Sequence, residues 1–190
     1  MLRATESSYF GELISRRIPF VVPRYQRPYA WEEGEVTDFI EDLKVLYNRR
    51  LNDPSHPKKH FFGGIVSVER FAPDLSDMGN VYDVVDGQQR LATIMLAIAL
   101  IIEELEELGK QADTAGDQET AHTAKSHAST IRESYLEYKE VVGSRPLERV
   151  RLRLSRTDAA FFEGLVKGHV HILRSSSASH EKIKECLGFD

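Results

Sequence analysis

VYDVVDGQQRLATIMLAIALII, residues 81–102, contains two apolar runs of different periodicity that meet at five polar or flexible residues. The run before the junction, 81–85, has the β-branched composition of a strand. The run after it, 91–102, suits a buried helix, since its 12 residues fall short of the ~20 that a membrane helix needs. A strand that leads directly into a buried helix predicts an α/β (α+β) domain, with a mixed sheet and flanking helices. Because the apolar run is too short to span a membrane, no membrane partner is expected.

The junction carries Asp86, Gly87, Gln88, Gln89 and Arg90 and allows two interpretations. In the first, Asp86 caps the helix, Gln89 completes a capping box and Gly87 eases the turn. In the second, the backbone N–H groups of the helix start, the two amides and the guanidinium form a phosphate site. Arg90 favours the second, because a cation in the first turn opposes the helix dipole by roughly 0.3–1 kcal/mol. Asp86 is then the residue that holds Mg²⁺ or orients a water.

A second unusual stretch is PRYQRPYAW, residues 23–31, whose two prolines exclude a regular helix. It combines phosphate-binding, amide-reading and stacking side chains, a mixture that suits nucleotides or an everted base. The candidate contacts are Arg24, Tyr25, Gln26, Arg27, Tyr29 and Trp31. In the alternative interpretation, the aromatic residues fill core pockets and the prolines only shape a turn.

A glycine pair, Gly63 and Gly64, follows the basic stretch KKH at 58–60. Glycines at such a place either allow a ligand or backbone to approach closely or mark a bulge.

Composition restricts the class of protein further. The 190 residues suit one domain or slightly more, with a net charge of -5 that argues against a surface coated with nucleic acid. Residues 1–31 nevertheless hold five arginines against two glutamates, which indicates a local anion site on an acidic protein. Cys186 is the single cysteine and the first residues lack a signal peptide, so a cytoplasmic location is expected.

Periodicity and turn residues predict the remaining elements. The expected strands are 18–22, 61–71, 81–86 and 150–155. The expected helices are 6–16, one from Glu32 to Tyr47, 88–109, one through Ile131 to Tyr138, and one over 157–168 that is capped by Thr157 or Asp158. The polar stretch 109–130 is either a mobile connection or the exposed start of another helix.

Four of these motifs, IPFVVPRYQRPYAW, HFFGGIVSVE, YDVVDGQQRLATI and RLRLSRTDAAFFEGLV, occur in the order found in one protein family. Over residues 9–167 the chain resembles the N-terminal domain of GmrSD-type modification-dependent restriction enzymes. The phosphorothioate-sensing defence protein SspE is similar, with the same domain order. The resemblance implies a ParB/sulfiredoxin-like fold with DGQQR at a nucleotide-hydrolysing site. It also implies phage defence, in which nucleotide hydrolysis is coupled to recognition of modified DNA.

The residues and the resemblance together assign roles. The expected catalytic residues are Asp86, Gln88, Gln89 and Arg90, and the expected nucleotide-binding residues are Gly87, Gly63, Gly64 and Thr93. The resemblance implies that the substrate is GTP or another nucleoside triphosphate, with Mg²⁺. The DNA-binding residues are those of the 23–31 stretch, facing a phosphorothioate or a modified base in double-stranded DNA.

The expected domain covers 1–170, followed by a linker at 171–190. The DNA-cutting HNH nuclease is expected on another domain or subunit, and a homo-oligomer is compatible with the sequence. Two alternatives stay open: a modified-DNA reader that does not hydrolyse nucleotides, and a ParB-like DNA nickase.

Overall fold

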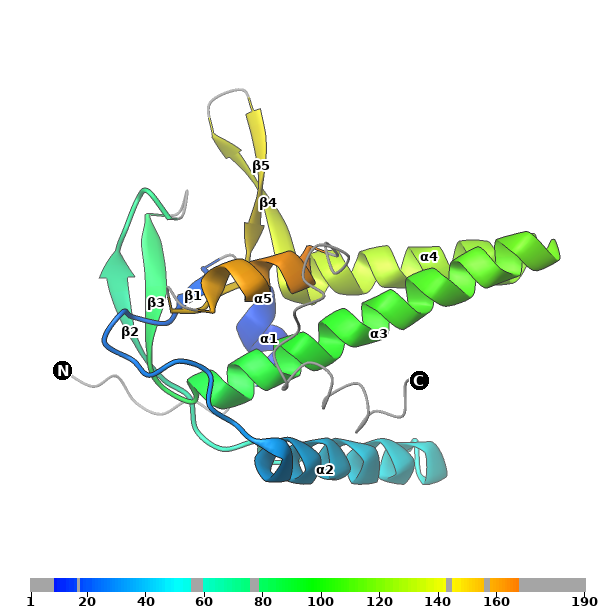
Figure 1. The fold of residues 1–190 in the computed structure, drawn as a ribbon, viewed down its shortest axis with the longest axis horizontal. Helices are drawn as coiled ribbons and strands as arrows, with labels where there is room; N and C mark the ends of the chain where they lie inside the picture. Colours follow the sequence, from blue (N-terminus) through cyan, green and yellow to red (C-terminus); the bar gives the residue numbers. More distant parts are fainter. Residues whose placement is uncertain are drawn as a thin grey trace.

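A computed structural model describes residues 9–16, 18–55, 60–75, 79–142, 145–155 and 158–167 (Figure 1). Its larger sheet has the strand order β2-β3-β1-β6. The strands are β1 (Phe20–Val21), β2 (Val66–Phe71), β3 (Asn80–Asp86) and β6 (Leu152–Arg153). β1 is parallel to both β3 and β6, whereas β2 is antiparallel to β3. This mixed sheet with flanking helices confirms the predicted fold class.

Helices flank this sheet, and α3 (Gln88–Ala115) is the central one. The others are α1 (Phe10–Ser15), α2 (Glu33–Asn52), α4 (Gln118–Ile131) and α5 (Ala159–Val166). Every residue of α3 from Leu91 to Ala97 is buried, as its continuous apolar sequence predicted. In the described ranges, no helix combines the length and apolar character required to cross a membrane.

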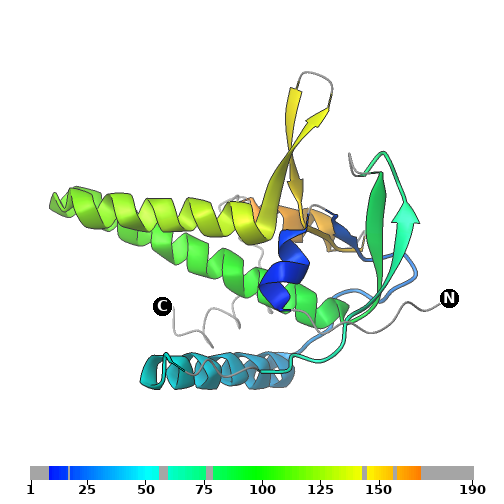
Figure 2. The same cartoon turned by 180° about the vertical axis from the view of Figure 1, so that it is seen from behind.

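The polar stretch 109–130 belongs to two helices, since residues 109–115 continue α3 and residues 118–130 lie in α4. Of the two expectations, the helix therefore holds and the mobile connection does not. α3 continues to Ala115 and turns at Gly116, whose φ of 81° places it in the left-handed region. α4 then returns along α3, and the two helices lie side by side away from the sheet (Figures 1 and 2). The buried residues of α4 are alanines, Ala121, Ala124 and Ala128, which allow close packing despite the low hydrophobicity.

The predicted helix through Ile131, Tyr135, Leu136 and Tyr138 is helical as far as Leu136 and is wrong from Glu137 onward. α4 ends at Ile131, a single π-turn follows (η1, Arg132–Leu136), and the chain then enters β4 (Glu137–Val142). β4 pairs with β5 (Arg145–Val150), and this two-stranded sheet projects from the rest of the molecule (Figures 1 and 2). The reason is tertiary: Arg151 donates its backbone N–H to the Leu136 carbonyl at 2.8 Å, and its guanidinium lies 5.4 Å from the Tyr138 ring.

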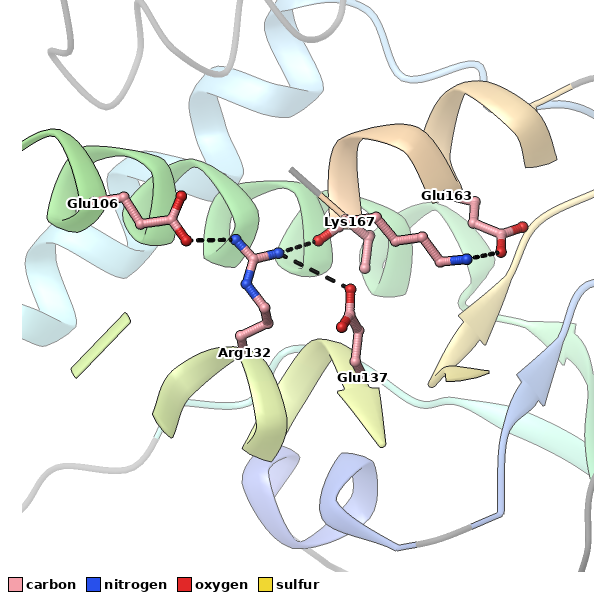
Figure 3. A network of polar contacts seen from close by, with 6 residues as sticks. Glu106, Arg132, Glu137, Glu163 and Lys167 are labelled. Carbon is pink, nitrogen blue, oxygen red and sulfur yellow. Dashed lines mark hydrogen bonds and ion pairs between the residues drawn. The ribbon is translucent and has the colours of Figure 1, made fainter. Parts of the chain in front are cut away.

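Arg132 connects the π-turn to two other helices (Figure 3). Its guanidinium donates to the Val166 carbonyl at the end of α5 at 2.6 Å and to the Glu106 carboxylate of α3 at 2.9 Å. The Glu137 carboxylate lies 4.0 Å away. The change from helix to strand therefore occurs where a cation holds α3, α5 and β4 together.

Candidate functional site

The junction between β3 and α3 has a different cap from the one the sequence predicted. β3 includes Asp86, and Gly87 is the N-cap of α3 with a left-handed φ of 91°. A side chain at Gly87 would also approach the Gly64 carbonyl oxygen to 3.1 Å. The capping box of Asp86 and Gln89, which was the first of the two interpretations of this junction, is therefore not formed. The first intrahelical bond runs from Leu91 N–H to the Gly87 carbonyl, so the three preceding amides have no acceptor within the helix.

Gln89 instead binds the backbone of the 23–31 stretch. Its Oε1 accepts from Ala30 N–H at 2.9 Å, and its Nε2 donates to the Pro28 carbonyl at 3.1 Å. Next to it, Gln88 Nε2 donates to the Arg27 carbonyl at 2.9 Å. Gln89 is only 7% exposed and both ends of its amide are bonded, so this side chain secures the backbone of a neighbouring loop.

Tyr29 strengthens the same attachment. Its phenol oxygen lies 2.8 Å from Thr93 Oγ1, and because Thr93 donates to the Gln89 carbonyl, Tyr29 is the donor in the first contact. Burial raises the pKa of the Tyr29 phenol, and the nearby Glu35 carboxylate adds to this effect. Tyr29 N–H donates to Asp158 Oδ2 at 2.8 Å. Asp158 is the N-cap residue of α5, which agrees with the prediction, but its carboxylate binds this other loop and makes no hydrogen bond to the start of α5.

The aromatic residues of the 23–31 stretch divide into two groups. Trp31 packs against the core, with its ring centroid 5.5 Å from that of Phe39. Tyr29 also packs against the core, so the alternative interpretation, in which aromatics fill core pockets, holds for these two. Tyr25 differs, because it is 77% exposed.

Arg90 binds the loop that precedes β2. Its Nη1 donates to the carbonyls of Phe62 and Gly64, each at 3.1 Å. Gly63 lies between them with a left-handed φ of 88°, and a Cβ there would stand 1.7 Å from Arg90 Nη1. The expected close approach at Gly63 is thus made by a guanidinium of the same chain. A cation in the first turn of α3 consequently has a structural partner and does not by itself require a bound anion.

A cavity of about 170 Å³ opens at this junction. It is lined by Gln26, Arg27, Trp31, Val85, Asp86, Gly87, Gln88, Gln89 and Arg90. The prediction that Asp86, Gln88, Gln89 and Arg90 share one pocket is confirmed. The volume is below the ~300–1,000 Å³ of typical small-molecule sites, so the cavity suits a phosphate group better than a whole nucleotide.

Several predicted site residues lie outside the lining of this cavity: Arg24, Tyr25, Tyr29, Gly63, Gly64 and Thr93. Conversely, Val85 lines the cavity, and its carbonyl accepts from Gln26 Nε2 at 2.9 Å. Val85 was missed because its place in the sequence indicates nothing but a strand. The catalytic and binding roles of all these residues, inside and outside the cavity lining, remain predictions.

The fold and the cavity define a mixed α/β domain whose polar pocket lies at a strand-to-helix junction. The family described as GmrSD restriction endonuclease, N-terminal domain, matches residues 10–185, and the chain belongs to this family. It is therefore a domain of a restriction system, and this places it in phage defence. No curated protein matches the chain.

Proposed function

We propose that this domain hydrolyses a nucleoside triphosphate, with GTP preferred, and that hydrolysis is coupled to recognition of modified double-stranded DNA. The main support is the cavity at the β3–α3 junction, where Asp86, Arg27 and Arg90 meet the amides of the α3 start that have no acceptor within the helix. Helix N-termini bind phosphate because N–H groups and the helix dipole both favour negative charge. Family membership supports a DNA-directed role.

The side chains of the cavity have separable tasks in this proposal. Arg27 is exposed and belongs to the 23–31 stretch, so it is assigned to the DNA backbone, and Arg90 is assigned to a phosphate of the nucleotide. Arg90 uses Nη1 for the 62–64 loop, and a guanidinium has five N–H donors, which leaves others for the same phosphate. Asp86 is exposed at the end of β3 and is the carboxylate of the cavity, placed to orient the attacking water.

A magnesium ion fits this donor set. In the described part of the chain, no three or more histidine, cysteine, aspartate or glutamate residues form a metal cluster. Mg²⁺ in phosphate-transfer sites is usually held by one or two carboxylates together with the phosphates, so Asp86 alone is a sufficient protein ligand. When bound, the ion would neutralise charge on the phosphate oxygens.

The DNA contact is assigned to the exposed part of the 23–31 stretch. Arg24 and Arg27 would hold the DNA backbone, while Tyr25 and Gln26 would provide selectivity. A phosphorothioate sulfur is larger and less hydrated than oxygen, so the 77% exposed Tyr25 ring offers it a partly apolar partner. Recognition would then license an HNH nuclease on another domain or subunit.

A second candidate, a DNA reader without hydrolysis, has a specific observation in its favour. Gln88, Gln89 and Arg90 all donate to backbone carbonyls, so three of the four junction side chains already serve the fold. In that case the junction would position the DNA-contacting stretch and would have no chemical task.

Release of inorganic phosphate from GTP and Mg²⁺ by the intact chain decides between the two. We expect the parental chain to release phosphate and Asp86→Asn to lose at least 99% of the rate, about 2.7 kcal/mol or more of barrier. Asp38→Asn, an exposed carboxylate on α2, is the control and should keep the parental rate. If the parental chain releases no phosphate with or without modified DNA, the reader interpretation replaces the hydrolase.

Binding to matched phosphorothioate and unmodified duplexes at two salt concentrations tests the DNA contact. Tyr25→Ala should weaken binding of the modified duplex selectively. Arg24→Ala should weaken both duplexes and lower the salt slope by roughly one unit for each lost phosphate contact. Equal weakening of both duplexes by Tyr25→Ala would show that recognition lies elsewhere.

A further inference from the structure

Four hydrogen bonds join residues 26–30 to residues 85–89, and each of them uses a glutamine side chain. Gln26 Nε2 donates to the Val85 carbonyl, and Gln88 Nε2 donates to the Arg27 carbonyl, both at 2.9 Å. Gln89 makes the other two, with the Pro28 carbonyl at 3.1 Å and Ala30 N–H at 2.9 Å. We call these three side chains, Gln26, Gln88 and Gln89, the amide clasp.

Glutamine is suited to this task because of the prolines. β1 pairs with β3 only as far as Val21 and Asp83, and Pro23 and Pro28 lack the N–H that a continued strand would need. A primary amide carries a donor and an acceptor, as a peptide unit does. The Gln89 side chain therefore makes the two hydrogen bonds that the backbone of a neighbouring strand would make, and residues 28–30 are held without strand pairing.

The amide clasp also forms part of the cavity wall. All three of its glutamines line the cavity, together with Arg27 and Asp86. One side chain, Gln88, is incompletely bonded: its Oε1 is buried, and the described residues provide it with no hydrogen-bond partner. A buried acceptor without a donor costs free energy. Any rearrangement that brings a hydrogen-bond donor to Gln88 Oε1 therefore stabilises this end of the clasp.

We propose that Gln88 and Gln89 are positioning residues that couple the cavity to the DNA-contacting stretch. A ligand in the cavity rearranges the clasp at Gln88, and this shifts the backbone that carries Arg27 and Tyr25. Because coupling between two binding sites is reciprocal, DNA on that stretch changes the affinity of the cavity by the same factor. This inference rests on the proposed function, which supplies the two ligands.

The clasp itself can be tested without any ligand, by hydrogen exchange of the Ala30 amide in the intact chain. Gln89→Leu should accelerate this exchange roughly tenfold, because one hydrogen bond is lost. Gln89→Glu keeps the acceptor for Ala30 and loses the donor to Pro28, so protection of the Ala30 amide should persist. Gln111→Leu, an exposed glutamine near the far end of α3, is the control and should exchange like the parent. Unchanged Ala30 exchange in a folded Gln89→Leu chain would overturn the clasp.

Coupling is measured with Trp31, the only tryptophan of the chain, which lines the cavity. Its fluorescence reports binding of a non-hydrolysable GTP analogue with Mg²⁺, alone and with a phosphorothioate duplex. The coupling factor is the ratio of the nucleotide dissociation constants without and with the duplex. It should be about fivefold or more for the parental chain and for Gln111→Leu, and near one for Gln89→Leu. Full coupling in Gln89→Leu would overturn the positioning role. If the parental chain binds no nucleotide, the proposed function fails and the coupling with it, whereas the Ala30 exchange still shows whether the clasp exists.

Discussion

Gly63 and Arg90 should behave as one energetic unit, although 26 residues separate them in the chain. The perturbation is Gly63→Ala, alone and combined with Arg90→Met, which keeps the aliphatic stem and removes the guanidinium. A Cβ at Gly63 would stand 1.7 Å from Arg90 Nη1, so the alanine variant must expel the guanidinium from the Phe62 and Gly64 carbonyls.

The magnitude follows from two terms. Loss of the hydrogen bonds from the half-buried Arg90 lowers the free energy of unfolding by about 1.5–3 kcal/mol. A left-handed alanine at Gly63 adds about 1–2 kcal/mol. Arg90→Met should therefore cost about 1.5–3 kcal/mol, and Gly63→Ala about 2.5–5 kcal/mol. The double variant should cost about as much as Gly63→Ala alone, because the same hydrogen bonds cannot be lost twice.

The assay is urea denaturation of the four chains, with the free energies compared as a double-mutant cycle. Gly64→Ala is the matched control: a Cβ there has no atom within 4 Å and the backbone is not left-handed, so its effect should stay small. If the two single effects add to within about 0.5 kcal/mol, the guanidinium does not occupy the space beside Gly63 and the description of this contact is refuted.

Three further predictions concern other parts of the chain. Arg151→Met should lower the free energy of unfolding in urea by about 2–4 kcal/mol, because Arg151 is 6% exposed and donates to the Ile14 and Glu133 carbonyls. Burial raises the pKa of the Tyr29 phenol, so its contribution to stability is complete below the unfolded value of about 10 and declines above it. Urea titrations at pH 9 and 11 should show a smaller decline for Tyr29→Phe. Hydrogen bonds from the Thr120 side chain and N–H lower the pKa of the Asp117 carboxyl at the start of α4. The stability that Asp117 contributes is therefore lost as the pH falls through this lowered pKa, and Asp117→Ala should show a weaker acid dependence in the same titration.

For the site, the sequence predicted the composition of the cavity better than the contacts within it. Asp86, Gln88, Gln89 and Arg90 share one cavity, as their place between a strand and a helix indicated. The hydrogen-bond partners of the Gln88, Gln89 and Arg90 side chains, however, come from residues 27–30 and 62–64, which are distant in sequence. No local rule relates a glutamine in a first helical turn to the Pro28 carbonyl, so a capping box was the nearest local explanation, and it was wrong.

For the fold, the failures lie where local preference and tertiary contacts disagree. Residues 131–138 have helical spacing, yet β4 begins at Glu137, because Arg132 donates from this turn to the distant Val166 carbonyl and the distant Arg151 N–H donates to the Leu136 carbonyl of the turn. The pairing of β4 with β5 was missed for the same reason. A two-stranded sheet buries little apolar surface, so its sequence has little of the alternation that predicts a strand. Its stability is also marginal unless it is attached to the body of the domain.

By itself, the sequence determined the elements whose signal is periodic and continuous: the strand 81–86, the buried helix from Gln88 and the amphipathic helix predicted from Glu32, which begins at Glu33 in the structure. Their apolar residues must be buried somewhere, and period alone distinguishes helix from strand. Only the tertiary structure decided what the polar residues of the junction do. A glutamine amide or a guanidinium binds whichever carbonyl the fold places within about 3 Å. That distance is set by the packing of loops 26–30 and 62–64 around α3, which no sequence pattern records.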